Sequence, residues 1–308
     1  MKALVTGGQG FIGSHLVDKL VDLGFDVTVI DNQSSQSNHE FYTNSKAHYV
    51  NQDVADPTTR IFYHGQDYVF HLAAHARIQP ALQNPIECVT SNVLGTTNVL
   101  QFSREMGVKK VILSSTSSSY GRNKPPLDEA MIPDPLNPYS VSKIAGESLA
   151  KMYKELFKLD TVCLRYFNVY GDRQALKGQY APVIGLFLEQ WKAGKPLTIV
   201  GDGEQRRDFT HVDDVVRANI ACMYSHCPPV LNIGTGTNHS IKEIAAMISD
   251  DVEFIPPRPA ECRETLAKIN RAKYFLDWEP KNQIEDYINE YKVQYENGRR
   301  TEEPVSEM

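Results

Sequence analysis

The segment VTGGQGFIGSHLVDKL near the N-terminus constrains the fold of this 308-residue chain more than any other part. Between a short β-branched run at residues 3–6 and an amphipathic stretch stand four glycines: Gly7, Gly8, Gly10 and Gly13. Glycines between a strand and a helix permit a tight turn, a close approach of backbone to a pyrophosphate, and contact between helix and strand. The segment therefore predicts a dinucleotide site at a helix N-terminus.

An acidic residue, Asp31, ends the second β-branched run, 18 residues after Gly13. A carboxylate at that place can accept hydrogen bonds from both hydroxyls of a ribose, and its charge would repel a 2′-phosphate. We therefore expect NAD rather than NADP.

Short strand-like runs alternate with stretches of helical spacing over the first half of the chain. Strands separated by helices predict right-handed βαβ units, hence an α/β fold with a doubly wound parallel (Rossmann) sheet covered on both faces. The expected strands lie at residues 3–6, 26–30, 67–73, 109–115 and 160–167.

The alternation loosens after residue 170, where glycines and prolines separate short elements. We expect residues 1–170 to form the NAD-binding Rossmann domain. Residues 171–308 are expected to form mainly a smaller C-terminal α/β lobe for the substrate, with some segments returning to the first domain.

Composition excludes several classes of protein. The formal charge of −6 gives no basic field for nucleic acid. Five scattered cysteines without a CxxC pair indicate reduced thiols and no zinc site, and we expect no bound metal. The N-terminus has no signal-peptide core, and no apolar run is long enough to span a membrane. We therefore expect a soluble cytoplasmic protein without a membrane partner.

The segment LNPYSVSKIAGES places a phenol and an ammonium one helical turn apart. Asn137 and Pro138 have the residue types of an N-cap and a first helical position, so Tyr139 falls in the first turn and Lys143 on the same face. A lysine cation, the positive helix end and an oxidised nicotinamide would each stabilise a phenolate. The pair predicts a catalytic base.

These motifs carry a resemblance. TGGQGFIG, Asp31, the loop SSTSSSYG at residues 114–121, and YSVSK, in that order, resemble the extended short-chain dehydrogenase/reductase family, and within it the NAD-dependent nucleotide-sugar epimerases and dehydratases. The likeness continues through RYFNVYG at residues 165–171 and GDGEQRRDFTHVDD at residues 201–214, so it covers nearly the whole chain.

The resemblance implies roles for individual residues. Thr116 would bond the sugar O4 while Tyr139, helped by Lys143, removes its proton so that C4 can be oxidised. NAD would be regenerated in each turnover and held tightly. The implied cofactor-binding residues are Gly7, Gly10, Phe11, Ile12, Gly13, Asp31, Asn32, Asp53, Val54, Leu72, Ala73, Ala74, Asn92, Tyr139, Lys143 and Tyr166.

The two residues after Thr116 bear on the reaction. Family members that eliminate water or carbon dioxide resemble this chain but carry carboxylates there, whereas here the positions are Ser117 and Ser118. A serine hydroxyl does not ionise near pH 7, so it cannot abstract a C5 proton. The expected reaction is therefore C4 epimerisation through a 4-keto sugar.

The resemblance also implies a nucleotide-sugar site in the C-terminal lobe, and the uridine base is expected from the resemblance alone. Asn168, Arg207 and Arg258 match residues that contact the diphosphate and nearby groups, and Glu261 matches one that binds the nucleotide ribose. The usual glycine of that loop is missing from Arg-Pro-Ala-Glu. Thr265 matches a pocket position that a tyrosine would narrow, so we expect UDP-N-acetylglucosamine and its galacto epimer to be accepted besides UDP-glucose and UDP-galactose.

Two other interpretations stay open. The substrate can be UDP-glucuronate, which would need a basic group at C6 such as Arg77 or Arg173, or another nucleotide sugar linked to CDP or dTDP. The second open interpretation is a non-catalytic regulator that binds NAD, although such a protein would have no need of Thr116, Tyr139 and Lys143. From the family we also expect a homodimer formed by helices near residues 86–106 and 138–157.

Overall fold

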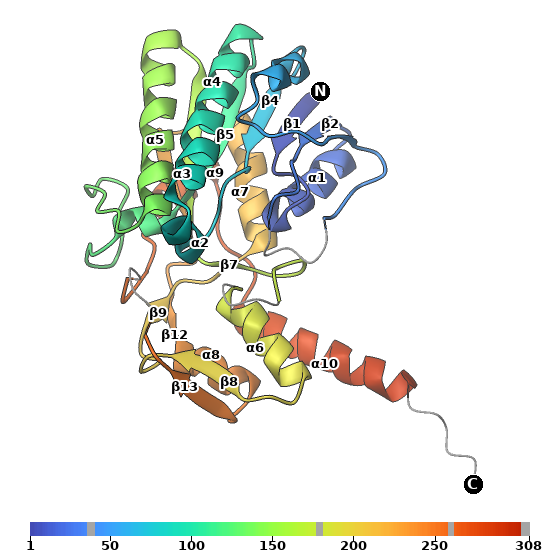
Figure 1. Ribbon diagram of the computed structural model, residues 1–308, viewed down its shortest axis with the longest axis vertical. Coiled ribbons are helices and arrows are strands. Elements are labelled where there is room, and N and C mark those ends of the chain that lie inside the picture. Colours follow the sequence, from blue (N-terminus) through green and yellow to red (C-terminus); the bar gives the residue numbers. More distant parts are fainter. Residues whose placement is uncertain (36–40, 177–180, 258–261, 303–308) are drawn as a thin grey trace.

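Seven parallel strands form one sheet in the order β11-β6-β5-β4-β1-β2-β3 (Figure 1). The structure is a computed structural model that describes residues 1–35, 41–176, 181–257 and 262–302. The predicted fold class, a doubly wound parallel sheet with a smaller lobe, is confirmed. The strands are β1 (Lys2–Thr6), β2 (Asp26–Ile30), β3 (His48–Val50), β4 (Tyr68–His71), β5 (Lys110–Thr116), β6 (Asp160–Tyr166) and β11 (Val230–Ile233).

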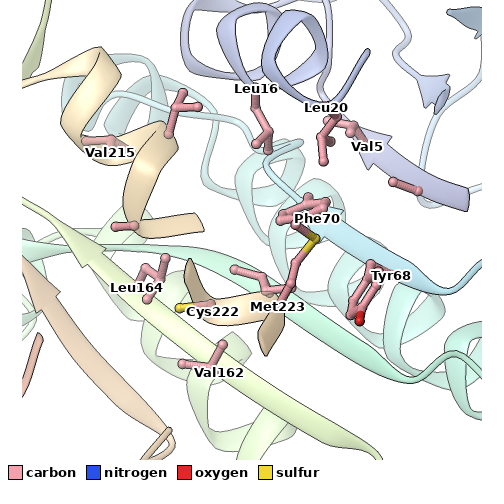
Figure 2. Packing of buried hydrophobic residues seen from close by; sticks show 14 of the residues in the cluster. Val5, Leu16, Leu20, Tyr68, Phe70, Val162, Leu164, Val215, Cys222 and Met223 are labelled. Atoms are coloured by element: carbon pink, nitrogen blue, oxygen red, sulfur yellow. The ribbon is translucent and has the colours of Figure 1, made fainter. Parts of the chain in front are cut away.

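Two apolar layers hold helices against the two faces of this sheet. On one face, Leu16 and Leu20 of α1 (Phe11–Asp22) and Val215 of α7 (Val212–Tyr224) share a cluster with Val5 and Phe70 of the strands (Figure 2). Helix α9 (Asn270–Leu276) joins this face. The other face is covered by η1 (Pro57–Tyr63), α4 (Gly95–Glu105) and α5 (Pro138–Phe157). Burial on both faces explains why the central strands consist mostly of apolar residues.

The chain returns to the large sheet after residue 200. Strand β11 pairs in parallel with β6, with Val230 opposite Cys163 and Ile233 opposite Tyr166. The short strand β10 (Thr210–His211) pairs with β7 (Val169–Tyr170), directly after β6. Residues distant in sequence are thereby brought to the carboxyl end of β6.

The smaller lobe lies below the carboxyl ends of the large sheet (Figure 1). Its core packs Phe187 and Leu188 of α6 (Val183–Lys192) against Ile244 of α8 (Ile241–Ile248) and Ile288 of α10 (Ile284–Glu302). Strand β8 (Leu197–Val200) pairs in parallel with β13 (Val252–Ile255). The remaining elements are α2 (Ile78–Gln83), α3 (Pro85–Val89), η2 (Thr90–Leu94), η3 (Ser117–Tyr120), β9 (Arg206–Arg207) and β12 (His239–Ser240).

Helix α5 begins where the sequence predicts. The Asn137 side chain accepts a hydrogen bond from the Ser140 amide at 2.9 Å, the Ser140 hydroxyl caps the Asn137 amide in return, and Pro138 is the first helical residue. An N-cap of this kind stabilises a helix by about 1 kcal/mol. It fixes Tyr139 in the first turn of α5.

Over the described residues, no helix is both long and apolar enough to cross a membrane.

Candidate active site

A cavity of about 470 Å³ runs along the carboxyl ends of the large sheet. In open α/β sheets ligands bind at this edge, because the loops that follow the parallel strands meet there. Strand β4 ends at His71, two residues before the predicted end, and residues 72–74 line the cavity instead. The predicted residues among its lining are Gly7, Gly10, Phe11, Ile12, Gly13, Asp31, Asn32, Asp53, Val54, Leu72, Ala73, Ala74, Thr116, Tyr139, Lys143, Tyr166 and Asn168.

The glycine turn after β1 has no room for side chains. Gly7 has a φ of +71°, and a Cβ there would lie 2.6 Å from the amide nitrogen of Ala73. A Cβ on Gly13 would collide with the carbonyl oxygen of Gly7. The absence of side chains leaves the backbone accessible to a ligand at this wall of the cavity, which is what a dinucleotide pyrophosphate requires.

The N-terminus of α1 supplies unpaired amides at the same wall. Its N-cap, Gly10, has no side chain to bond the first-turn N–H groups. The first four amides of a helix have no partner within the helix and carry its positive end, so they form an anion site. Phe11, Ile12 and Gly13, which carry such amides, all line the cavity.

Two carboxylates lie at the end of the cavity formed after β2 and β3. Asp31 accepts hydrogen bonds from the backbone amides of Gln9 and Gln33, one on each oxygen and both at 2.9 Å. Asp53 accepts one from Asn32 at 2.8 Å. Each Asp31 oxygen keeps a free lone pair, so the side chain is fixed in place and can still accept two ribose hydroxyls.

A buried histidine ties three elements together beneath the glycine turn. His71 bonds the Thr6 hydroxyl at 2.8 Å through Nδ1 and the Thr96 hydroxyl at 2.9 Å through Nε2. Burial lowers the pKa of His71 to about 3, and the nearby Lys143 charge acts in the same direction. The neutral ring therefore joins the ends of β1 and β4 to α4.

The predicted base, Tyr139, lines the cavity together with Thr116. Burial raises the pKa of the Tyr139 phenol, while a hydrogen bond with the Thr116 hydroxyl and the positive charge of Arg77 act to lower it. Thr116 is itself held at the end of β5, where its Oγ1 accepts a hydrogen bond from the Ser118 amide at 3.1 Å. Thr116 and Tyr139 therefore lie together at one wall of the cavity.

The Lys143 ammonium donates a hydrogen bond to the Ser114 carbonyl oxygen at 2.8 Å. Burial lowers the pKa of Lys143 to about 8, with Cys163, Cys88 and Glu147 opposing that shift. Arg77 lines the same cavity, and its positive charge favours the ionised form of the Tyr139 phenol. The sequence pattern thus indicates one cation beside the phenol, and the structure adds another.

A second cavity of about 240 Å³ adjoins the first on the side of the smaller lobe. Five residues line both cavities: Arg77, Asn168, Val169, Ala181 and Pro182. Arg207 lines the second cavity, where its Nη1 donates to the backbone carbonyls of Arg206 and Arg263. The predicted Arg258 and Glu261 lie outside the described residues.

Two of the predicted site residues are absent from the lining of both cavities. Thr265 does not line either cavity: only 3% of it is exposed, and its Oγ1 accepts hydrogen bonds from the Asn168 side chain and the Asp208 amide, both at 3.2 Å. Asn92 is also buried away from the cavities, because its side chain bonds the backbone of His75 and the Ser142 hydroxyl. Thr265 and Asn92 therefore form hydrogen bonds within the protein and do not line the cavities.

Arg77 is the residue that the sequence motifs undervalue. The prediction names it only as one of two arginines that could bind a uronate, yet it lines both cavities, whereas Arg173 pairs with Asp18 at 2.7 Å. The available signal was its place just after β4, where loops of a doubly wound sheet reach the ligand.

The fold and the cavity together define the class: a Rossmann-fold, dinucleotide-dependent protein whose cavity is lined by a threonine at the end of β5 and by a tyrosine and a lysine of α5. Residues 3–234 match the model of the NAD dependent epimerase/dehydratase family, and the chain belongs to that family. The predicted cofactor, NAD, is the one on which this family depends.

Solved structures of three relatives superpose over almost the full length of the chain. A UDP-glucose 4-epimerase of Thermotoga maritima, with UDP-glucose, is 37% identical with a TM-score of 0.91, covering 98% of this chain and 100% of its own. A UDP-N-acetylglucosamine 4-epimerase of Methanobrevibacter ruminantium, with UDP-N-acetylmuramic acid, is 34% identical with a TM-score of 0.90. The match covers 97% of this chain and 98% of that one. A UDP-glucuronic acid 4-epimerase of Bacillus cereus, with UDP-glucuronic acid and NAD, is 32% identical with a TM-score of 0.86. The match covers 98% of this chain and 100% of that one.

Proposed function

We propose that this protein interconverts C4 epimers of a UDP-hexose, with UDP-glucose and UDP-galactose as the first pair to test. One observation carries the choice of reaction. Among the described residues that line the first cavity, the only carboxylates are Asp31 and Asp53, which follow β2 and β3, while Ser117 and Ser118 follow Thr116. Elimination needs a base for the C5 proton, and this end of the cavity supplies no carboxylate for that step.

The residues of the trio divide the work. The Thr116 hydroxyl orients the O4 hydroxyl of the sugar, and the Tyr139 phenolate takes its proton, so that the O4–H bond breaks as the phenol forms. Lys143 and Arg77 place positive charge around this proton transfer. After the sugar has turned over, Tyr139 returns the proton to O4.

The residues present fit NAD. The side-chain-free turn at Gly7 and Gly13 and the amides that begin α1 suit the pyrophosphate, and Asp31 suits a ribose without a 2′-phosphate. When bound, NAD would accept a hydride from C4 and return it to the opposite face. Because oxidation and reduction balance within each turnover, we expect the cofactor to stay bound through purification.

The second cavity supports a nucleotide-sugar site. Asn168 lies where the two cavities meet and Arg207 lines the outer one, so a molecule in the second cavity could extend its sugar to Tyr139. A planar guanidinium binds diphosphate oxygens in pairs. A second candidate substrate is UDP-glucuronate, favoured by the position of Arg77 in the cavity. The expected tolerance for an N-acetyl group stays a prediction: the likeness to a UDP-N-acetylglucosamine 4-epimerase supports it, whereas the buried Thr265 does not.

We also propose a homodimer formed through α3, α4 and α5. Six large apolar side chains on these helices, and on η2 between α3 and α4, are exposed, among them Ile86 at 79% and Leu156 at 67%. Exposed apolar residues gathered on neighbouring helices are typical of an interface. The others are Val89, Leu94, Val141 and Phe157. Light scattering on the purified protein would give twice the 34.7 kDa chain mass; a mass of one chain at micromolar concentration would refute the dimer.

Purified protein incubated without added cofactor tests the proposed function. UDP-glucose, UDP-N-acetylglucosamine and UDP-glucuronate are followed separately by proton NMR, and the galacto epimer of UDP-glucose is the expected product. Tyr139→Phe should abolish interconversion while the protein still releases NAD on denaturation. An unchanged rate in Tyr139→Phe would refute the assigned base.

A further inference from the structure

Arg77 occupies an unusual place in the site. It precedes α2 as its N-cap, and its side chain lines both cavities where they meet. Burial lowers the pKa of the guanidinium, and the one charge that opposes this effect is that of Tyr139. Among the described residues, no carboxylate forms an ion pair with it. A partly buried cation of this kind requires an anionic counterpart.

The backbone of Arg77 is also strained. Its φ of +112° lies in a region that residues with a Cβ rarely adopt. Such conformations cost about 1–3 kcal/mol each and persist where the surrounding structure enforces them, often at functional sites. Glycine would adopt this conformation without that cost, so the arginine side chain has a reason to be there.

The groups around the Tyr139 phenol come from four elements. Thr116 at the end of β5 donates or accepts a hydrogen bond, Arg77 before α2 contributes a positive charge, and Cys88 of α3 is a thiol that disfavours the phenolate. Lys143, on α5 itself, directs its ammonium to the Ser114 carbonyl. Arg77 and Tyr139 line the same cavity, so the guanidinium charge and the phenol face a common space, while the Lys143 ammonium is engaged by a backbone carbonyl.

We propose that Arg77 is a second cation of the catalytic site, which stabilises the negative charge on the Tyr139 phenol before the proton of the substrate is taken. This inference rests on the proposed function for its role in turnover, although not for its effect on the phenol. An opposite charge within about 4–6 Å favours the charged form of a group by one or more pKa units. Each unit changes the phenolate fraction about tenfold at a pH below the pKa.

Removing the positive charge of Arg77 makes the Tyr139 phenolate less stable, so the ionisation of Tyr139 moves to higher pH. Arg77→Gln should shift the ultraviolet difference titration of Tyr139, obtained by subtracting the matching Tyr139→Phe protein, upward by about one pH unit. The acid limb of kcat/KM for UDP-glucose should move by the same amount, with an about tenfold lower rate on that limb.

Three further variants separate charge from structure. Arg77→Lys keeps the charge and should shift the titration less than Arg77→Gln does. Arg77→Gly relieves the positive φ while removing the charge, so it should shift the titration as far as Arg77→Gln while folding at least as stably. Arg60→Gln is the matched control, because Arg60 is exposed and pairs with Glu105 outside the cavity; it should leave the titration unchanged.

The titration tests the effect of Arg77 on the Tyr139 phenol even if no tested sugar is epimerised. The proposed role of Arg77 and the proposed function can therefore fail separately. An unchanged titration in both Arg77→Gln and Arg77→Gly would overturn the inference and leave epimerisation intact. So would a loss confined to UDP-glucuronate turnover without a shift, because Arg77 would then recognise a carboxylate at C6.

Discussion

Glu147 and Arg165 form a buried two-pronged ion pair beside the strand that carries Thr116. The Arg165 Nε–Glu147 Oε1 distance is 2.9 Å and the Nη2–Oε2 distance is 2.7 Å, and both side chains are almost fully buried. Ser115 lies opposite Arg165 in the sheet, and its hydroxyl donates a hydrogen bond to Glu147 Oε1 at 2.5 Å. Glu147 lies one helical turn after Lys143, so the pair joins α5 to the two strands that end at the cavity.

Glu147→Gln should destabilise the protein by about 3 kcal/mol, because Arg165 would be left buried without a counter-charge. It should also lower kcat, since Ser115 and its neighbour Thr116 lose their anchor on α5. Urea unfolding and turnover of UDP-glucose measure the two effects. Glu155→Gln, from the exposed Lys151–Glu155 pair of the same helix, is the control and should change stability by less than about 1 kcal/mol.

Two helical glycines should respond in opposite ways to alanine. Gly13→Ala should lower the free energy of unfolding by several kcal/mol and abolish NAD binding, because the new Cβ would collide with the Gly7 carbonyl oxygen at the pyrophosphate turn. Gly146→Ala meets only the Thr96 side chain at 3.6 Å, an ordinary contact, and should stabilise α5 by about 0.5–1 kcal/mol. Thermal unfolding and the nucleotide released on denaturation provide the readouts. Equal stability of the two variants would show that the turn can relax.

Thr265→Val should lower stability by about 1–3 kcal/mol, because the Asp208 amide and the Asn168 side chain lose a buried acceptor. Thr265→Ser, which keeps the hydroxyl, should retain most of that stability. Because Thr265 does not face the pocket, neither variant should alter the ratio of turnover between UDP-glucose and UDP-N-acetylglucosamine. A tenfold change in this ratio in Thr265→Ser would return the residue to the substrate site.

Stability should fall as the pH drops below about 6.5, the ordinary value of an unfolded histidine. His71 is neutral when folded because burial lowers its pKa to about 3, so between these values the unfolded chain binds the extra proton. The free energy of unfolding should lose up to about 1.4 kcal/mol per pH unit from this residue. His71→Asn should reduce the slope in urea titrations at pH 5–7, whereas the exposed His64→Asn should not.

The repeating part of the molecule could be predicted because it depends on local patterns. Alternating apolar runs and a capped helix at Asn137 give the parallel sheet and the position of Tyr139, and the comparisons confirm the fold class and the family. The sequence patterns do not predict strands β3 and β11, because β3 has three residues and β11 follows a proline-rich turn far along the chain. Their pairing depends on long-range contacts that no local pattern reveals.

The orientation of individual side chains was harder to predict. Counting residues from Glu261 predicts Thr265 in the pocket, but such a count carries no information about the direction in which a side chain points. The sequence patterns name Arg77 only as a candidate for binding a uronate, whereas the structure places it in the cavity lining with a positive φ that its residue type does not favour. Functional sites are where proteins most often depart from the conformational preferences of their residue types, so local sequence patterns predict such residues poorly.

Epimerisation in D₂O tests the central claim most directly. The protein, without added NAD, is incubated with UDP-glucose in deuterated buffer, and the product is analysed by NMR. The account predicts UDP-galactose that keeps hydrogen at both C4 and C5, because the hydrogen at C4 is transferred within the site and no base removes the proton at C5. Deuterium at C5, or a 4-keto-6-deoxy product, would contradict it.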